Sequence, residues 1–216
     1  MDGMLDGLMN VNTLKITNAI LKLVSQQDEF KGAWTAIGRI APERLSSLRH
    51  VATIESIGSS TRIEGVKLTD RDVEKLLSNL GSQSFANRDE KEVAGYASVM
   101  ETVSEHAEDI PLTVNYIQQL HGQLLQYSEK DVRHQGQYKT LSNRVEAFNS
   151  EGKSVGVVFQ TATPFDTPRL MDELIAWTNT ALDDKSLHPL LIIAVFTVAF
   201  WRYTPSKTET AGCHVF

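Results

Sequence analysis

Apolar residues recur at the spacing of an α-helix along almost the whole chain of 216 residues. The clearest stripe follows the i, i+3, i+4, i+7 positions of one helix face and consists of Val93, Tyr96, Ala97, Met100 and Val103. Comparable stripes recur on both sides of it, so six or seven helices are expected. Because each helix must bury its apolar face against another element, this pattern predicts an all-α fold.

Residues that commonly cap helices precede several of these stripes. Thr69 can cap a helix through a capping box with Asp72, and Thr113 can cap a later one. Asp166 or Thr167, placed before a proline, can start a further helix, because proline is favoured in the first turn. Helix starts are therefore expected near residues 70, 114 and 167.

One segment departs from the helical spacing. Residues 144–148 and 153–159 are rich in valine and phenylalanine, and they flank the polar turn Asn149–Gly152. Such runs around a polar turn predict a β-hairpin. The side chains assigned to it are Val145, Phe148, Val155 and Val157. From the residues alone, a plain surface hairpin and a functional one are equally open.

The charge balance limits the classes of partner. With 27 acidic and 21 basic residues the formal net charge is −6, which argues against nucleic acid or an anionic membrane as the main partner. The start, Met1–Asp6, carries acids where a signal peptide needs a basic and then an apolar run. The longest apolar stretch, Leu187–Trp201, falls short of the about 20 residues that span a bilayer. A cytoplasmic protein without membrane contact is therefore expected.

Cysteine and histidine usage indicates no metal site. The only cysteine is Cys213, so neither a disulfide nor a thiolate cluster within the chain is expected. The histidines show no H-E-x-x-H or comparable ligand spacing, and each is interpreted as structural or surface. His121 falls near an apolar face and is interpreted as a satisfied histidine at the margin of the core, not as a base. No metal ligand is predicted.

The last eighteen residues, Ala199–Phe216, do not continue the apolar pattern of the helix before them. Their codons offer an explanation. When each new codon takes the third base of one codon and the first two of the next, the genetic code permits the string R-F-L-A-I-H-P-F-Q-D-G-N-G-R-L-S-R-V. This string contains the pattern H-x-F-x-D-G-N-G-R-x-x-R in full.

The regrouped pattern is the signature of the Fic family, whose members typically transfer AMP from ATP to a hydroxyl group of a target protein. The chain thus resembles a Fic protein in which one base was lost near the codon of Val198. The resemblance implies that the catalytic histidine and the phosphate-binding loop are not encoded here, so no catalytic residue is assigned. ATP and Mg²⁺ are the ligands of intact relatives, and neither is expected to bind tightly to this chain.

A second motif, Ser60–Gly65, resembles the inhibitory pattern of one Fic subclass, which is serine or threonine, three residues, glutamate, then glycine or asparagine. Ser60 and Glu64 share one helix face, and Gly65 allows the chain to leave the helix. The plain alternative is an ordinary helix end with a solvated glutamate. The resemblance implies that Glu64 inhibits by pairing with the second arginine of the signature. Because that arginine is not encoded, Glu64 is expected to have no partner.

Further resemblance to the family extends from about residue 45 to residue 198. It includes the segment Leu120–Leu125, the step Gly136–Lys139 and the dipeptide His188–Pro189, which opens the helix before the signature. Lys139 stands where the family pattern has an arginine, and a lysine lacks the planar fork of arginine. The expected organisation is an N-terminal helical region with the inhibitory motif (1–90), a truncated Fic core (91–198) and an out-of-frame tail (199–216).

The resemblance implies a Fic-type helical domain with a small β-hairpin flap, truncated before its catalytic loop. The first functional hypothesis is a protein adenylyltransferase that is inhibited through Glu64 and inactive in this chain, with the hairpin docking an extended segment of a target protein. The second is a non-enzymatic helical module that binds a partner protein. In both cases, loss of the signature helix is expected to expose apolar surface around residues 190–198 and to favour self-association.

Overall fold

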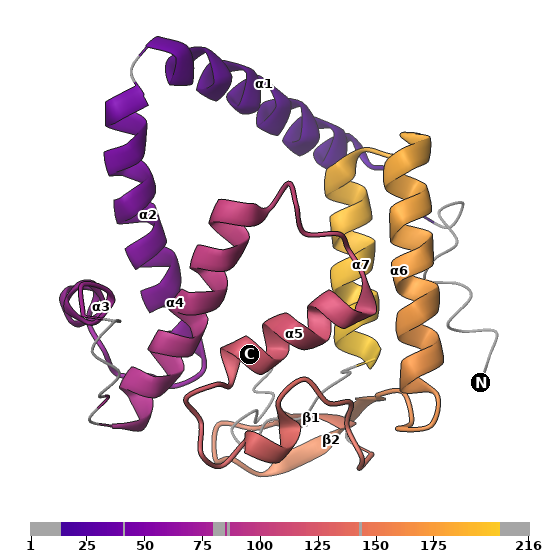
Figure 1. Cartoon of the computed structure of the whole chain (residues 1–216). Coiled ribbons are helices and arrows are strands. Elements are labelled where there is room, and N and C mark those ends of the chain that lie inside the picture. The colour runs from indigo at the N-terminus through magenta and orange to yellow at the C-terminus, as the bar shows by residue number, and fades with distance from the viewer. Residues whose placement is uncertain (1–13, 41, 80–84, 86, 143, 204–216) are drawn as a thin grey trace. The chain divides into compact units, whose positions relative to one another are not determined.

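The computed structural model describes residues 14–40, 42–79, 85, 87–142 and 144–203 (Figure 1). Within them the chain is helical apart from one short hairpin, as predicted. The helices are α1 (Asn18–Ile40), α2 (Pro42–Ile63), α3 (Asp70–Leu77), α4 (Arg88–His106), α5 (Val114–Leu124), α6 (Thr167–Asp184) and α7 (Pro189–Tyr203). The strands are β1 (Arg144–Phe148) and β2 (Ser154–Gln160), and a 3-10 turn covers Val132–His134.

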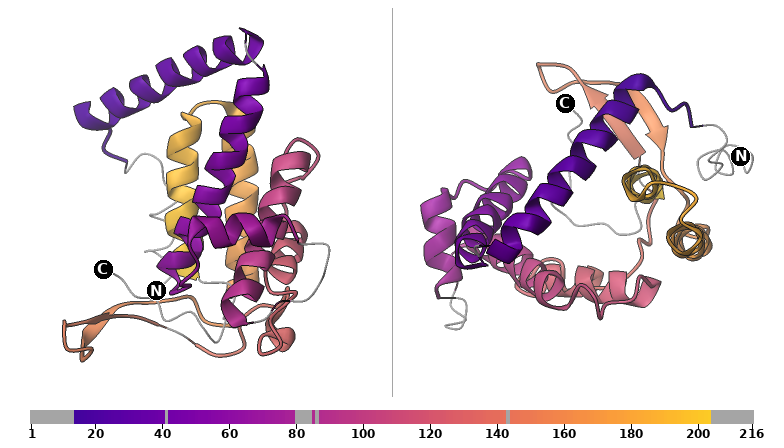
Figure 2. Two further views of the ribbon diagram at one scale, coloured as in Figure 1. Left: turned by 90° about the vertical axis from the view of Figure 1, so that its left-hand side faces the viewer. Right: turned by 90° about the horizontal axis from the view of Figure 1, so that it is seen from above.

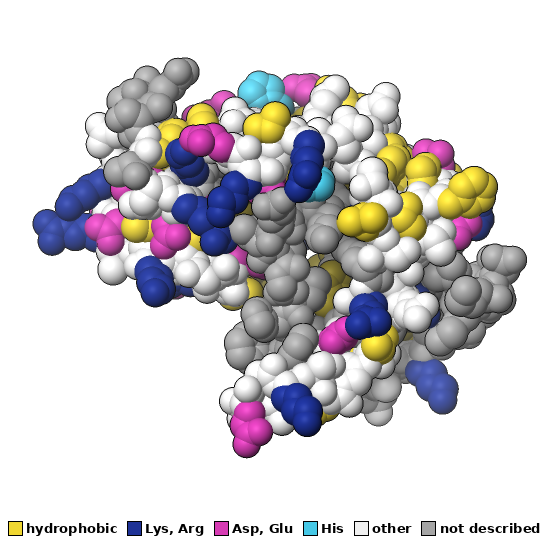
Figure 3. Space-filling view, turned by 90° about the horizontal axis from the view of Figure 1, so that it is seen from below, with side chains coloured by type: hydrophobic (Ala, Val, Ile, Leu, Met, Phe, Trp, Pro, Cys, Tyr) yellow, Lys and Arg dark blue, Asp and Glu magenta, His cyan; other side chains and the backbone are white. Residues whose placement is uncertain are grey.

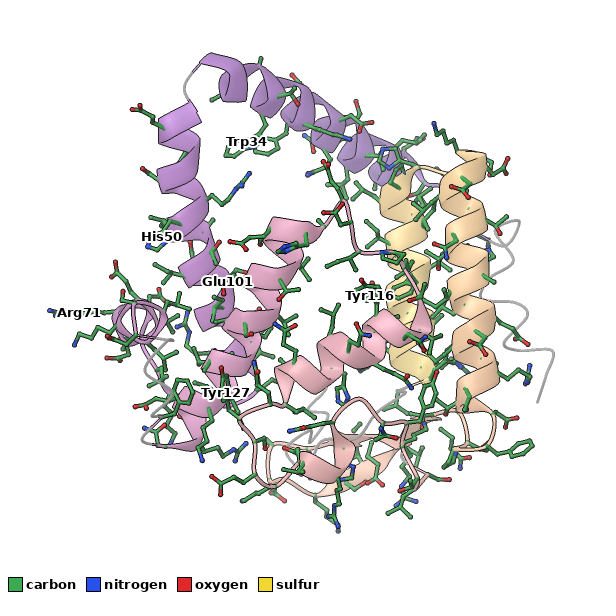
Figure 4. All side chains as sticks on the ribbon, in the orientation of Figure 1. Trp34, His50, Arg71, Glu101, Tyr116 and Tyr127 are labelled. Carbon is green, nitrogen blue, oxygen red and sulfur yellow. The ribbon has the colours of Figure 1, made fainter. Side chains whose placement is uncertain are left out.

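The chain divides into two compact units, residues 1–56 and 57–216, and the division falls within α2. In the first unit, α1 carries a stacked pair of aromatic rings, Phe30 and Trp34, whose centroids lie 5.7 Å apart. Figure 4 labels Trp34 on this helix. The segmentation at residues 90 and 198 that the family resemblance suggests stays a prediction.

In the second unit, α6 and α7 lie side by side in all views (Figures 1 and 2). Each helix buries one face. The buried apolar side chains of α6 are Leu170, Met171, Leu174, Ile175 and Ala181. Those of α7 are Ile192, Val195, Ala199 and Tyr203, and their spacing keeps them on one side of the helix. The first five residues of the expected tail, 199–203, therefore continue α7 and contribute to the core.

Local capping explains where several helices begin. Thr69 and Asp72 form the predicted capping box of α3, with the Thr69 N–H donating to the Asp72 carboxylate at 3.1 Å. Thr113 caps α5 as predicted, because its hydroxyl accepts the Tyr116 N–H at 3.2 Å. Asp166 occupies the N-cap position of α6 but makes no capping hydrogen bond. Its carboxylate instead accepts from the Thr163 hydroxyl at 2.6 Å.

The hairpin has the predicted place and a polar turn. Strands β1 and β2 pair antiparallel, from Arg144 opposite Gln160 to Phe148 opposite Ser154, with two irregularities in the register. The side chain of Asn149 closes the turn by accepting the Lys153 N–H at 2.9 Å. Asparagine is suited to this role because its short side chain can bond to nearby backbone groups.

None of the helices in the described part of the chain combines the length and the apolar character needed to cross a membrane.

Helices α4 and α5 approach each other closely at Gly95, which lies on α4. A Cβ atom at this position would lie 2.1 Å from the backbone carbonyl oxygen of Leu124, at the end of α5. Backbone atoms cannot yield as the tip of a flexible side chain can. The two helices can therefore meet in this way only if residue 95 is a glycine.

Gly95→Ala is expected to reduce the free energy of unfolding by about 3 kcal/mol, because the added methyl group forces the helices apart. Gly122→Ala is the matched control on α5, since its Cβ would meet only the Gly136 nitrogen at an ordinary 3.7 Å. Urea denaturation followed by circular dichroism measures the free energy of unfolding of both variants and of wild type. Equal stability losses for the two variants would contradict the close approach of α4 and α5.

Candidate functional site

The predicted inhibitory segment forms the end of α2. The N–H of Val66 donates to the carbonyl of Thr61 at 3.1 Å, and the N–H of Gly65 donates to that of Arg62 at 3.0 Å. Together with the positive φ of 96° at Gly65, these bonds make a Schellman motif, in which a glycine ends the helix. Val66 is buried behind it. The prediction that Gly65 lets the chain leave the helix is therefore confirmed.

Ser60 and Glu64 have different surroundings. The hydroxyl of Ser60 accepts a hydrogen bond from the Tyr96 hydroxyl of α4 at 3.1 Å. The side chain of Glu64 is exposed and makes neither an ion pair nor a hydrogen bond with the residues that the structure describes. Ser60 thus fastens α2 to α4, whereas the Glu64 carboxylate is available to a cation from outside the described residues.

The segment after α2 is fastened to its neighbours at two further points. The Arg62 guanidinium binds the Asp70 carboxylate at 2.8 Å and the Leu68 carbonyl at 3.3 Å. Gly58, one turn earlier on α2, leaves room for this pair, because a Cβ there would lie 2.6 Å from the Asp70 oxygen. The N–H of Lys67 also donates to the Asp89 carboxylate at 2.9 Å. The backbone that carries Glu64 is therefore held in place.

The hairpin offers apolar side chains to solvent. Val155 and Val157, two of the predicted docking residues, are 64% and 46% exposed. Val145 and Phe148 lie on β1, and their side chains are outside what the structure describes. Beside them, hydrogen bonds from Ser154 and Arg144 lower the pKa of Glu146. The structure places the predicted residues on one hairpin and leaves their role as a prediction.

Lys139, the departure from the family pattern, is buried, with only 3% of its surface exposed. Its ammonium donates to the Thr161 hydroxyl at 2.9 Å and to the carbonyl oxygen of Tyr203 at 2.8 Å. Tyr203 is the last residue of α7. Burial lowers the pKa of Lys139 from its usual value of 10.5 to about 8, because removal from water disfavours the charged form.

A cavity of about 320 Å³ lies beside α5 and is lined mainly by apolar side chains, among them Leu124, Met171 and Phe200. His121 also lines it. The Nδ1 atom of His121 accepts the Gly136 N–H at 3.2 Å, so the neutral ring carries its proton on Nε2. That atom is buried and has no hydrogen-bond partner among the described residues. Burial lowers the pKa of His121, while the charge of Asp131 opposes the shift.

This geometry corrects one detail of the expectation for His121. The side chain lies at a core margin as expected, but only one of its two nitrogens is satisfied by the described residues. Among those residues, no group of three or more His, Cys, Asp or Glu side chains is placed to hold a metal ion. Cys213 and the rest of the tail, residues 204–216, lie outside the described part of the chain.

Basic and acidic side chains are interspersed on the face that Figure 3 shows, as far as the described residues go. The ion pairs agree with this mixture, since Arg88 pairs with Glu92 and Arg169 pairs with Glu173. Mixed charges of this kind do not produce the single-sign field that attracts a polyanion.

Sequence reasoning missed three partners of the site. Tyr96 binds Ser60 from 36 residues away, and Thr161 binds Lys139 from 22 residues away. The third partner, the carbonyl of Tyr203, belongs to the backbone and is 64 residues from Lys139. No local pattern signals these pairs, because each depends on how the helices pack.

Gly65→Ala is expected to destabilise the second unit by about 1–2 kcal/mol, because a β-carbon disfavours a positive φ. Nothing lies within 4 Å of the added Cβ, so the loss is conformational and not steric. Gly65→Asn is the matched control, since asparagine tolerates positive φ better. Chemical denaturation of the three proteins should show stability decreasing from wild type to the Asn variant and then to the Ala variant. An alanine variant as stable as wild type would contradict the positive φ.

Lys139 should make stability depend on pH in the alkaline range. Its folded pKa of about 8 lies below the unfolded value of 10.5, so the unfolded chain binds more protons between these values. The stability of wild type relative to Lys139→Met is therefore expected to rise from pH 8 to pH 10.5, by at most about 3 kcal/mol. Denaturation at several pH values measures it, with the exposed Lys153→Met as control. If the difference in unfolding free energy between wild type and Lys139→Met did not change with pH, it would contradict burial of the ammonium.

Comparison with known proteins identifies the domain. Residues 111–205 match the model of the Fic/DOC family. Among solved structures, the chain is similar to a Fic-domain-containing signaling protein from Bacteroides thetaiotaomicron, with a TM-score of 0.68 and 23% sequence identity. The similarity covers 85% of this chain and 66% of that one, so the chain spans just under two thirds of that protein's length.

None of the curated proteins compared with the chain matches it. The structural likeness at this identity shows the fold, and the family model covers α5, the hairpin, α6 and α7. These are the elements that meet at Lys139 and around the cavity. The chain therefore has a helical fold of the Fic type, in which residues 111–205 match the Fic/DOC family.

Proposed function

We propose that the chain derives from a Fic-type protein adenylyltransferase that transfers AMP from ATP to a Ser, Thr or Tyr hydroxyl of a target protein. The proposal rests on the Fic/DOC match over residues 111–205 and on the position where α7 ends. In the regrouped reading, the codon of the signature histidine combines the last base of the Tyr203 codon with the first two of Thr204. That histidine would then directly follow α7, whose last residue is Tyr203.

The chain as it stands does not carry this activity. In this proposal neither ATP nor Mg²⁺ binds tightly to the chain, because the glycine-rich loop of the signature, which holds both in intact relatives, is not encoded. No catalytic step is therefore assigned to the residues of this chain. The roles proposed for them are inhibition of the transfer reaction, docking of the target protein and, in a protein with the restored frame, support of the signature loop.

Glu64 is the inhibitory residue in this proposal. Its carboxylate is exposed and has no partner among the described residues, while the Schellman motif, Ser60 and Arg62 hold the backbone around it. A charge on a fixed backbone can pair with an incoming guanidinium at little entropic cost. In a protein with the restored frame, that partner is the second arginine of the signature.

The hairpin is the docking element for the target. The described part of the chain forms only a two-stranded sheet, so β1 and β2 each leave one edge without a neighbouring strand. An extended segment of a target protein can add to such an edge through main-chain hydrogen bonds. The exposed Val155 and Val157 would then contact side chains of that segment.

A second candidate function is a non-enzymatic binding module, and one observation favours it. The side of α7 opposite its buried face is apolar and exposed, with Leu190, Ile193, Val198 and Trp201 between 38% and 56% exposed. Their spacing places them on one stripe. Such a stripe supports association with a partner helix or with a second copy of the chain.

Restoring the frame at the Val198 codon is expected to yield a protein that labels itself or a target with AMP from radiolabelled ATP. Glu64→Gly should strengthen the labelling by removing the inhibitory carboxylate. Glu64→Gln is a conservative variant that should act in the same direction, and Glu105→Gln, at an exposed position of α4, is the control that should not. The unrepaired chain should show neither labelling nor tight Mg-ATP binding in a calorimetric titration.

Absence of labelling from the repaired protein, with and without Glu64→Gly, would leave only the binding module. Sequencing the coding DNA across the Val198 codon tests the frame itself.

A further inference from the structure

Lys139 joins three segments that are far apart in the sequence. It lies shortly after the 3-10 turn Val132–His134, and its ammonium reaches the Thr161 hydroxyl and the Tyr203 carbonyl at 2.9 Å and 2.8 Å. Thr161 follows the last residue of β2, and Tyr203 ends α7. The base of the hairpin and the end of α7 therefore share one buried cation.

A second hydrogen bond connects the same two segments without Lys139. The N–H of Ala162 donates to the Arg202 carbonyl at 3.3 Å. Two consecutive residues after the hairpin thus face two consecutive residues in the last turn of α7. The carbonyls of a last helical turn have no partner inside the helix and carry a partial negative charge. A cation and a backbone N–H are suitable partners for such carbonyls.

Burial of the Lys139 ammonium costs free energy, so the hydrogen bonds that offset this cost indicate what the residue does. A buried ammonium loses its hydration and must replace it with hydrogen bonds. Lysine has three donors, and the structure directs two of them to these acceptors. Hydrogen bonds that involve a charged group are stronger than those between neutral groups, so these two contacts can hold the two segments together.

We propose that Lys139 is a positioning residue that fixes the end of α7 to the base of the hairpin. A segment docked on the hairpin and the last turn of α7 then keep a fixed relative geometry. Because the contact at α7 is made to a backbone carbonyl, it does not depend on which side chain the reading frame places at position 203. The part of this proposal that concerns catalysis rests on the proposed function, and the coupling of the two segments does not.

Hydrogen exchange of backbone amides in the complete chain tests the coupling. Lys139→Met should accelerate exchange together in residues 161–162 and in the last turn of α7, by roughly 10-fold to 100-fold for the loss of a charged hydrogen bond. Amides in the middle of α4 should exchange as in wild type. Lys139→Arg should restore slow exchange in both places, since a guanidinium also donates to both acceptors.

Thr161→Val provides a second variant that keeps the buried cation and removes one acceptor. It should accelerate exchange at the end of α7, although Thr161 lies far from α7 in the sequence. The overall free energy of unfolding is not the readout, because removal of a buried charge can itself stabilise a protein. Acceleration at one segment alone, or equal acceleration throughout the chain, would overturn the proposal.

The frame-restored protein separates this inference from the proposed function. If that protein labels a target, Lys139→Met should lower kcat while the KM for ATP changes little, and Lys139→Arg should recover kcat. Coupled exchange in a protein that never labels would refute the adenylyltransferase proposal and leave the coupling of the hairpin to α7 intact. Labelling that Lys139→Met leaves unchanged would overturn the positioning role.

Discussion

The packing of α7 against α6 is the contact on which the second unit depends most. The buried face of α7 includes Val195 and Ala199 and continues to Tyr203, the last residue of the helix. That end then meets the base of the hairpin through Lys139 and through the bond from Ala162 to Arg202. A helix with apolar residues on two opposite sides is usually covered on both sides. The described residues cover only one side of α7.

The helices could be predicted because the signals that start and end them are local. Apolar spacing of 3.6 residues indicated the number of helices, and Thr69 and Thr113 indicated two of their starts. The hairpin could also be predicted, since Asn149 belongs to a turn that needs no distant partner. The predicted start of α6 is also confirmed, although Asp166 at its N-cap bonds to Thr163 and not to the helix backbone.

Other features could not be predicted because they are properties of packing. The close approach at Gly95 depends on the position of the Leu124 carbonyl, which no pattern in α4 reveals. The division at residues 56 and 57 falls inside a continuous helix, where composition gives no sign of a boundary. At the candidate site, the Ser60–Gly65 motif could be found because its spacing is local. Tyr96 could not, since its bond to Ser60 connects two different helices.

The exposed stripe on α7 has a consequence for the life of the chain in a cell. Trp201 and Ile193 present apolar surface of the kind that folded proteins normally cover. Chaperones and proteases continuously sort chains with such surfaces. Such surface is therefore expected to shorten the half-life of the protein, and a partner that covers α7 would lengthen it.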